Sequence, residues 1–312
     1  MTSQPRFKLG IVSGLLRHYP LDLALRLIQE AGYDGIELWG GQYHGYVWDL
    51  VDASGQLDTA RVRALRTMCT DAGLEIAGYT PEQLLYPINT LVDHAPPFDG
   101  PALRKRSIRN LELCVEIAAE LECRRMALIV PMWLWAAEAG GYRRTTRKEV
   151  LEASVETIAH FVDVAAANGV DILFEPLVYH DSNGIATLEE AKLVFDQITS
   201  PHLQMMIDFG HVAVTAHREG IDPVDYLAAH LDTFGRRITH IHFDDNNLEV
   251  DAHLAPGEGI IDLQAMTNLV VASGYQGWIS AELSVLGPYA LPENAERLLR
   301  DTRIEMTRLL AR

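Results

Sequence analysis

The fold is decided between residues 170 and 283, where four apolar segments each end in residues that can bind a metal ion. They are VDILFEP (170–176), ending at Glu175, LQMMIDFGH (203–211), with Asp208 and His211, ITHIHFDD (238–245), with His240 and His242, and GWISAEL (277–283), with Glu282. Each segment has the length of a strand and precedes a helix-like segment, which is typical of buried strands in a parallel sheet. The carboxyl ends of neighbouring strands in a closed parallel barrel surround one pocket, so these polar side chains should converge there.

The rest of the chain alternates strands and helices in the same way. Strands are predicted at residues 7–15, 33–40, 74–81 and 123–132, and helices at residues 20–32, 57–73, 103–121 and 148–168. In the C-terminal half, helices are predicted near residues 188–198, 223–234, 262–273 and 292–310. Strict alternation of eight strands and eight helices predicts an α/β fold, a (β/α)8 TIM barrel, with residues 1–312 forming one domain. No GxGxxG motif follows the first strand, which argues against a dinucleotide-binding fold.

Composition narrows the functional classes. The chain has 312 residues, of which 48% are hydrophobic, and a formal net charge of -17, which opposes binding to nucleic acid or to anionic membranes. No run of about 18 apolar residues could span a bilayer, and the N-terminal MTSQPRFKLG has no apolar signal core. The three cysteines lack CxxC spacing and are expected to be reduced and buried. We therefore expect a cytoplasmic protein without nucleic-acid or membrane partners.

Several motifs, taken together, resemble a known family. They are GYDGIELWGG (32–41), GYTPE (78–82), ILFEPL (172–177), MIDFGH (206–211), THIHFDD (239–245), HLAPGEG (253–259) and ISAEL (279–283). In this order and spacing, they resemble the sugar isomerase/epimerase group of xylose-isomerase-like barrels. The resemblance is closest to its keto-sugar 3-epimerase and fructosamine-type epimerase members, and it extends over nearly the whole chain.

The resemblance implies a single divalent metal ion. In the members of this group, a glutamate, an aspartate, a histidine and a second glutamate from strands five to eight hold the ion. By motif, these roles fall on four residues of this sequence: Glu175, Asp208, His242 and Glu282. The resemblance also implies that Glu175 and Glu282 act as acid and base. It implies that His211 faces the substrate, with a place at the start of a helix as the alternative. Mn2+ is the expected ion, with Mg2+, Co2+ or Zn2+ as alternatives.

These residue types suit proton transfer next to a carbonyl group. Removal of that proton gives an enediolate, whose charge a divalent cation can stabilise, and two bases can serve the two faces of the substrate. A single carboxylate at a strand end can instead cap the following helix, but four ligands on consecutive strands favour a metal site. His240 is expected to point the other way on its strand and to pack behind the barrel wall.

Loop residues supply the predicted substrate contacts. Tyr79 and Glu82 are candidates for contacts to substrate hydroxyls, with a structural role in the turn as the alternative. Trp39, Trp133 and Trp135 are candidates for an apolar wall against a sugar face or an aglycone, with loop packing as the alternative. The loop MWLWAAEAGG (132–141) lacks the histidine that fructosamine-type members tend to carry there, so the sequence departs from that substrate pattern.

Asp251 and His253 resemble the DxH metal pair of the endonuclease IV branch of the same superfamily. That branch also needs histidines after strands three and four, where this sequence has GYTPE and IVPMW, so its three-metal cluster is not expected. Both residues, with Glu258, are instead expected to order the loop after strand seven and to help to bind the substrate.

Three functions remain open from the sequence. The first is a metal-dependent isomerase or epimerase that acts on a keto-sugar or a sugar derivative through an enediolate. The second is the catalytic subunit of a C-glycoside deglycosidase, a carbon–carbon lyase that expels the aglycone from a 3-keto-glycoside and works with a small partner subunit. The third is a barrel that binds a polyol or a partner chain without turnover. A homo-oligomer, or a hetero-oligomer with a small second subunit, is the expected assembly.

Overall fold

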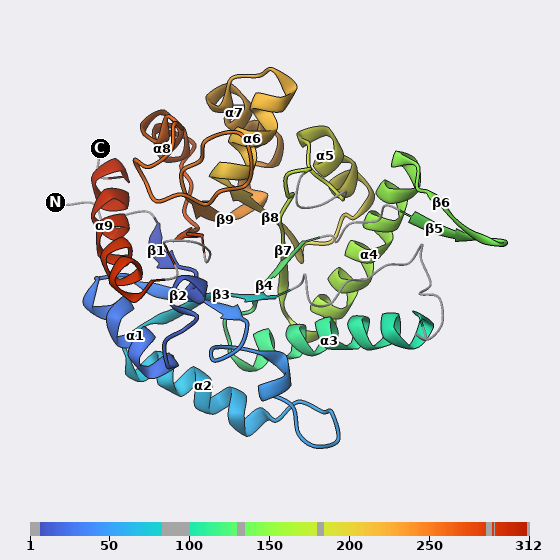
Figure 1. Cartoon of the computed structure of the whole chain (residues 1–312), viewed down its shortest axis with the longest axis horizontal. Helices are drawn as coiled ribbons and strands as arrows, with labels where there is room; N and C mark the ends of the chain where they lie inside the picture. Colours follow the sequence, from blue (N-terminus) through green and yellow to red (C-terminus); the bar gives the residue numbers. More distant parts are fainter. Residues whose placement is uncertain are drawn as a thin grey trace.

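Eight parallel strands form one sheet at the centre of the protein (Figure 1). The computed structural model describes residues 7–82, 100–129, 135–179, 184–284, 289 and 291–310. The strands are β1 (Lys8–Ile11), β2 (Gly35–Gly40), β3 (Glu75–Pro81), β4 (Arg125–Leu128), β7 (Asp171–Phe174), β8 (Leu203–Asp208), β9 (Ile238–Phe243) and β10 (Trp278–Ala281). Their order is β1-β10-β9-β8-β7-β4-β3-β2, and a parallel bridge between Val12 and Glu37 brings the two edge strands together. The predicted (β/α)8 barrel is confirmed as a nearly closed barrel.

Helices surround the strands on the outside (Figure 1). They are α1 (Leu21–Glu30), α2 (Thr59–Asp71), α3 (Gly100–Glu120), α4 (Arg147–Asn168), α5 (Leu188–Gln197), α6 (Phe209–Glu219), α7 (Pro223–Phe234), α8 (Leu263–Ala272) and α9 (Pro292–Leu310). Local signals set their ends. In α4, Thr146 and Glu149 form a capping box that satisfies backbone donors at the start, and Gly169 ends the helix with a φ of 65°.

The structure departs from the predicted alternation in three places. The first strand ends at Ile11, and the short 3-10 helix η1 (Ser13–Leu16) replaces its predicted end. The predicted loop after β4 contains an antiparallel hairpin of β5 (Trp135–Glu138) and β6 (Gly141–Arg144), and Gly140, with a φ of 88°, supplies its turn. Helix α6 was not predicted, and it begins directly after β8 because the Asp208 side chain accepts a hydrogen bond from the backbone N–H of His211.

Packing of apolar side chains between the barrel and its helices forms the core. Cys69, Cys114 and Cys123 are free and buried, and burial raises the pKa of Cys114 to about 12, which keeps this thiol protonated. Among the helices in the described part of the chain, none has the length and apolar character needed to cross a membrane.

Candidate metal centre

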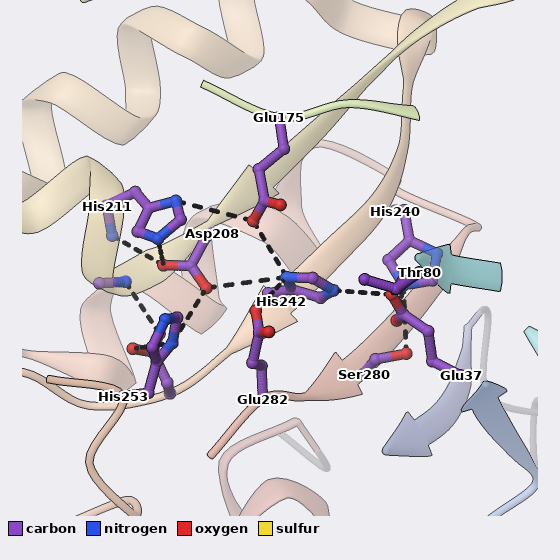
Figure 2. Close-up of polar contacts among 12 residues, drawn as sticks. Glu37, Thr80, Glu175, Asp208, His211, His240, His242, His253, Ser280 and Glu282 are labelled. Atoms are coloured by element: carbon purple, nitrogen blue, oxygen red, sulfur yellow. Dashed lines mark hydrogen bonds and ion pairs between the residues drawn. The ribbon is translucent and has the colours of Figure 1, made fainter. Parts of the chain in front are cut away.

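The four predicted ligands come together where β7, β8, β9 and β10 end. Asp208 is the last residue of β8, His242 lies near the end of β9, and Glu175 and Glu282 directly follow β7 and β10. One ligand atom from each of the four lies within 4.8 Å of the others. Figure 2 shows the three carboxylates turned toward the same edge of the His242 ring. These neighbouring strands therefore present three carboxylates and one imidazole to a single point.

Distances within this cluster are short enough for one cation to bind all four groups. His242 Nδ1 lies 2.6 Å from Glu282 Oε2, 3.1 Å from Glu175 Oε1 and 3.9 Å from Asp208 Oδ2. Asp208 Oδ2 is buried and has no hydrogen-bond partner among the described residues. A buried carboxylate oxygen without a partner is costly, and a cation at this point would remove the cost. Carboxylate oxygens and an imidazole nitrogen suit Mn2+ or Zn2+ well, so the residues fit the metal that the sequence predicts.

The charges of the cluster shift the pKa values of its members. Burial alone would lower the pKa of His242, but the carboxylates of Glu282, Glu37 and Glu175 outweigh burial and hold it well above its usual range. Burial raises the pKa of Glu175, and the nearby His242 only partly offsets that effect. For Glu282, the imidazoles of His242 and His253 outweigh burial and lower the pKa. The cluster is therefore rich in negative charge that a cation or a proton must balance.

His211 lies at the edge of the cluster, at the start of α6. Its Nδ1 donates to the carbonyl oxygen of Pro176 at 3.1 Å, and its Nε2 lies 3.1 Å from Asp251 Oδ2. Burial would lower its pKa, but Asp208 and Asp251 outweigh burial and hold the pKa well above its usual range. The ring also approaches Glu175 Oε1, at 3.6 Å from Nδ1. The structure thus places an imidazole with a raised pKa against the ligand set, where the sequence predicts a substrate contact.

Asp251 and His253 lie beside the cluster as well. His253 Nε2 is 2.9 Å from Asp251 Oδ2, and its Nδ1 is 3.5 Å from Asp244 Oδ2 and 4.0 Å from Asp208 Oδ2. Asp244 was not predicted as a site residue. It directly follows β9, its Oδ1 accepts from the backbone N–H of Gly210, and burial together with the charge of Asp208 raises its pKa to about 8.

Asp245 orders the loop after β9, a role that was predicted for Asp251 and His253. Its carboxylate accepts from the backbone N–H groups of Gly257, at 2.9 Å, and Ile261, at 3.1 Å. Glu258, predicted to help in this loop, accepts a hydrogen bond from the hydroxyl of Tyr289. Asp244 and Asp245, which follow HIHF, therefore support the site and its loop. The sequence shows both within the THIHFDD motif, but no role was predicted for them.

A second polar cluster lies inside the barrel, next to the first. Glu37 of β2 is fully buried; its Oε2 lies 2.6 Å from His240 Nε2, and its Oε1 lies 3.0 Å from His242 Nε2. The hydroxyl of Thr80 donates to the same carboxylate. Burial would raise the pKa of Glu37, but His242 and His240 outweigh burial and hold it well below its usual range. Figure 2 shows the His242 ring between this cluster and the four-ligand cluster.

The predicted orientation of His240 was therefore wrong. Residues two positions apart in a strand point to the same face, so His240 and His242 both enter the barrel interior and both bind Glu37. The expectation that His240 is buried and hydrogen-bonded is confirmed, because its side chain is fully buried and also lies 3.1 Å from Ser280 Oγ.

The predicted substrate contacts Tyr79, Glu82 and Trp39 differ in burial and in the residues that they contact. The Tyr79 side chain is fully buried, and its hydroxyl donates to the carbonyl oxygen of Gly45 at 2.6 Å, so the structure does not bring it to the ligand cluster. Glu82 is half-buried and directly follows β3. The half-buried Trp39 ring packs against the backbone at Gly41 and makes an edge contact with His44, with ring centres 6.4 Å apart.

Two tryptophans were predicted in the loop after β4. Trp135 begins β5, the residue is 46% exposed, and the Arg144 guanidinium lies 5.6 Å from its ring centre. The hairpin that carries it projects outward beside α4 (Figure 1). Trp133 lies outside the described residues.

Comparison with known proteins assigns the chain to a family. The family model described as the xylose isomerase-like TIM barrel matches residues 25–303, so the chain belongs to that family. Fructoselysine 3-epimerase of Shigella flexneri is 27% identical over 276 residues, which cover 88% of this chain and 90% of the relative. 3-Dehydro-D-guloside 4-epimerase of Escherichia coli (strain K12) is 22% identical over 262 residues, which cover 82% of this chain and 84% of the relative.

Solved structures share the fold at lower sequence identity. The structure of D-psicose 3-epimerase from Clostridium cellulolyticum H10 with D-tagatose aligns with a TM-score of 0.72 at 17% identity, covering 97% of this chain and 99% of that one. The structure of the IolI protein with a bound zinc atom aligns with a TM-score of 0.71 at 18% identity, covering 98% of both chains.

Proposed function

We propose that this protein is a divalent-metal-dependent epimerase that removes and returns a proton next to the carbonyl group of a keto-sugar or keto-sugar derivative. The observation that carries the proposal is the convergence of Glu175, Asp208, His242 and Glu282 from four neighbouring strands, with ligand atoms within 4.8 Å of one another. A structural role for these groups would leave the buried Asp208 Oδ2 without a hydrogen-bond partner among the described residues.

Glu175 and Glu282 are the proposed proton-transfer groups. They follow β7 and β10, the outer two of four consecutive strands in the sheet, so they flank the cluster from two sides. Carboxylates placed on two sides of a substrate can serve its two faces, as epimerisation requires. A bound cation would stabilise the negative charge that develops on the substrate oxygens when the proton leaves.

His211 and Asp251 are proposed to orient the substrate. The pKa of His211 is raised and its ring lies next to Glu175, so in its protonated form it can stabilise negative charge that develops on a substrate oxygen. The negative charge of the ligand carboxylates favours a neutral sugar over a sugar phosphate.

The comparisons support the same substrate class. The names of two relatives describe epimerases of a fructose-derived amine and of a keto-glycoside. One structure with this fold carries zinc, which supports a metal-binding role for the cluster. We therefore propose keto-sugars that carry a further substituent, as well as free ketohexoses, as the substrates to test first.

The decisive experiment combines metal analysis with isotope exchange. The purified protein should contain about one divalent metal ion per chain, because the cluster provides one four-ligand set. The double variant Glu175→Gln, Asp208→Asn should lose the ion, whereas Glu249→Gln, on the exposed loop after β9, should keep it. In deuterated water, an active substrate should gain deuterium at the carbon next to its carbonyl. Stoichiometric metal in the double variant, or turnover without deuterium incorporation, would refute the proposal.

A second candidate is elimination of the aglycone from a 3-keto-glycoside. The similarity to a 3-dehydro-D-guloside 4-epimerase favours it, because that name describes a glycoside with the carbonyl that elimination needs. Release of free aglycone, measured beside deuterium exchange on the same 3-keto-glycoside, separates the two reactions. Sugar binding without exchange or release would instead indicate a non-catalytic barrel.

A further inference from the structure

Glu37 occupies an unusual place for a carboxylate. It lies in β2, inside the barrel, and its side chain has no exposed surface. Bulky apolar side chains normally fill this space, and a buried charge is costly unless it is paired and hydrogen-bonded. Glu37 meets that requirement with three donors: His240 Nε2, His242 Nε2 and the hydroxyl of Thr80.

The contact between Glu37 and His242 decides which nitrogen of the His242 ring can bind a metal ion. Glu37 Oε1 lies 3.0 Å from His242 Nε2, while His242 Nδ1 faces the carboxylates of Glu175 and Glu282 (Figure 2). A carboxylate only accepts, so Nε2 must carry the hydrogen of this bond. The lone pair of Nδ1 can then point at the four-ligand cluster.

The other contacts of Glu37 fix its own position. Its second oxygen is held by His240 at 2.6 Å, and its backbone forms the parallel bridge to Val12 where β1 meets β2. Glu37 and His242 are 205 positions apart in the chain, so this contact ties β2 to β9 through the barrel interior. A carboxylate anchored in this way can set both the tautomer and the tilt of the His242 ring.

We propose that Glu37 is a positioning residue for the metal site: it holds the hydrogen of His242 on Nε2 and thereby presents Nδ1 as the metal ligand. This inference rests on the proposed metal site and extends it to a residue that does not touch the ion. Hydrogen bonds from carboxylates to ligating histidines typically change metal affinity by about 10- to 100-fold.

Metal affinity measured by calorimetric titration with Mn2+ tests the proposal. Glu37→Gln keeps the size of the side chain but loses its charge, and we expect about tenfold weaker binding. Glu37→Leu removes both acceptors, and we expect weakening toward 100-fold. The matched control is Tyr33→Phe, which removes a buried hydrogen bond to Leu299 just before the same strand but does not contact the histidines. Its metal affinity should equal that of the wild type.

A spectroscopic measurement tests the tautomer directly. In the Zn2+-loaded wild type labelled with 15N-histidine, the His242 signals, assigned by their loss in His242→Gln, should show a protonated Nε2 and a metal-bound Nδ1. This experiment remains informative if Glu37→Leu does not fold.

The outcomes distinguish the two proposals. If the wild type binds no metal, the proposed metal site fails, and the role of Glu37 fails with it. If the wild type binds metal and the folded Glu37→Gln binds it equally well, or if Nε2 is the metal-bound nitrogen, only the positioning role of Glu37 is overturned.

Discussion

Asp251 Oδ2 lies 3.1 Å from His211 Nε2 and 2.9 Å from His253 Nε2, so one carboxylate holds two imidazoles beside the four-ligand cluster. The other nitrogen of His211 donates to the carbonyl oxygen of Pro176, which fixes the orientation of this ring. Asp251 therefore helps to orient His211 and, together with Asp208, to raise its pKa.

Replacement of Asp251 by asparagine should weaken catalysis without loss of the metal. Asp208 and Asp251 together raise the pKa of His211, so Asp251→Asn should lower that pKa, and the protonated form should disappear at a lower pH. We expect kcat/KM to fall about tenfold at neutral pH and its alkaline limb to move to lower pH. Glu249→Gln on the same loop is the control. An unchanged pH profile of kcat/KM in Asp251→Asn would contradict the role of His211.

Local patterns were sufficient to predict most of the barrel. Each buried strand is a short apolar run, and each outer helix carries its own end signals, so the alternation is visible without knowledge of the contacts. Helix α6 was missed because capping and metal binding were treated as alternatives for Asp208, whereas its Oδ1 caps the helix while its Oδ2 points to the cluster. A single aspartate in the sequence does not reveal that its two oxygens have different functions.

The four ligands were predictable because each stands at or near the end of its strand, and parallel topology brings strand ends together. Glu37 was not identified, although the sequence places it in a strand, because its two histidine partners lie more than 200 positions away on another wall of the barrel. The direction of His240 could have been predicted from its two-residue spacing to His242. The pairing of both histidines with one carboxylate required the structure.

Tyr79 should contribute to stability rather than to substrate binding. Its hydroxyl donates to the carbonyl oxygen of Gly45 at 2.6 Å in a fully buried setting. Tyr79→Phe leaves that carbonyl without this donor, and we expect a loss of about 1 kcal/mol in the free energy of unfolding. Urea denaturation measures the loss, and steady-state kinetics should show KM unchanged within about twofold. A large rise in KM with unchanged stability would instead support the substrate contact predicted from the sequence.

Metal binding should strengthen as the pH rises. The carboxylates around His242 raise its pKa well above the usual range despite burial, so we expect the imidazole to hold a proton on Nδ1 when the metal is absent. That proton must leave before Nδ1 can bind the ion. We expect the association constant for Mn2+ to rise about tenfold per pH unit from pH 6 to 8. Calorimetry in two buffers with different ionisation enthalpies should detect about one released proton; a pH-independent constant would refute this coupling.

Substitution of Trp135 tests whether the hairpin of β5 and β6 takes part in binding an aglycone. Trp135 is 46% exposed, the Arg144 guanidinium lies over its ring, and its hairpin projects outward beside α4 (Figure 1). We therefore expect Trp135→Ala to change KM equally, by less than about twofold, for a free ketohexose and for an aryl 3-keto-glycoside. A rise confined to the aryl substrate would place the ring in an aglycone site, because burial of apolar surface contributes roughly 25 cal/mol per Å2.

Glu175 and Glu282 should prove necessary for catalysis beyond their contribution to metal binding. Each is replaced in turn by glutamine, which keeps an oxygen for the ion but cannot accept the proton, and excess Mn2+ restores the occupancy, as confirmed by metal analysis. We expect turnover to fall by about 100-fold or more in both variants, while Glu249→Gln remains fully active. If the two carboxylates serve opposite faces of the substrate, each variant should lose deuterium exchange from solvent into only one of the two epimers. The epimer affected should differ between the two variants. Loss of exchange from the same epimer in both variants would show that a single base serves the reaction and that the second glutamate only binds the ion.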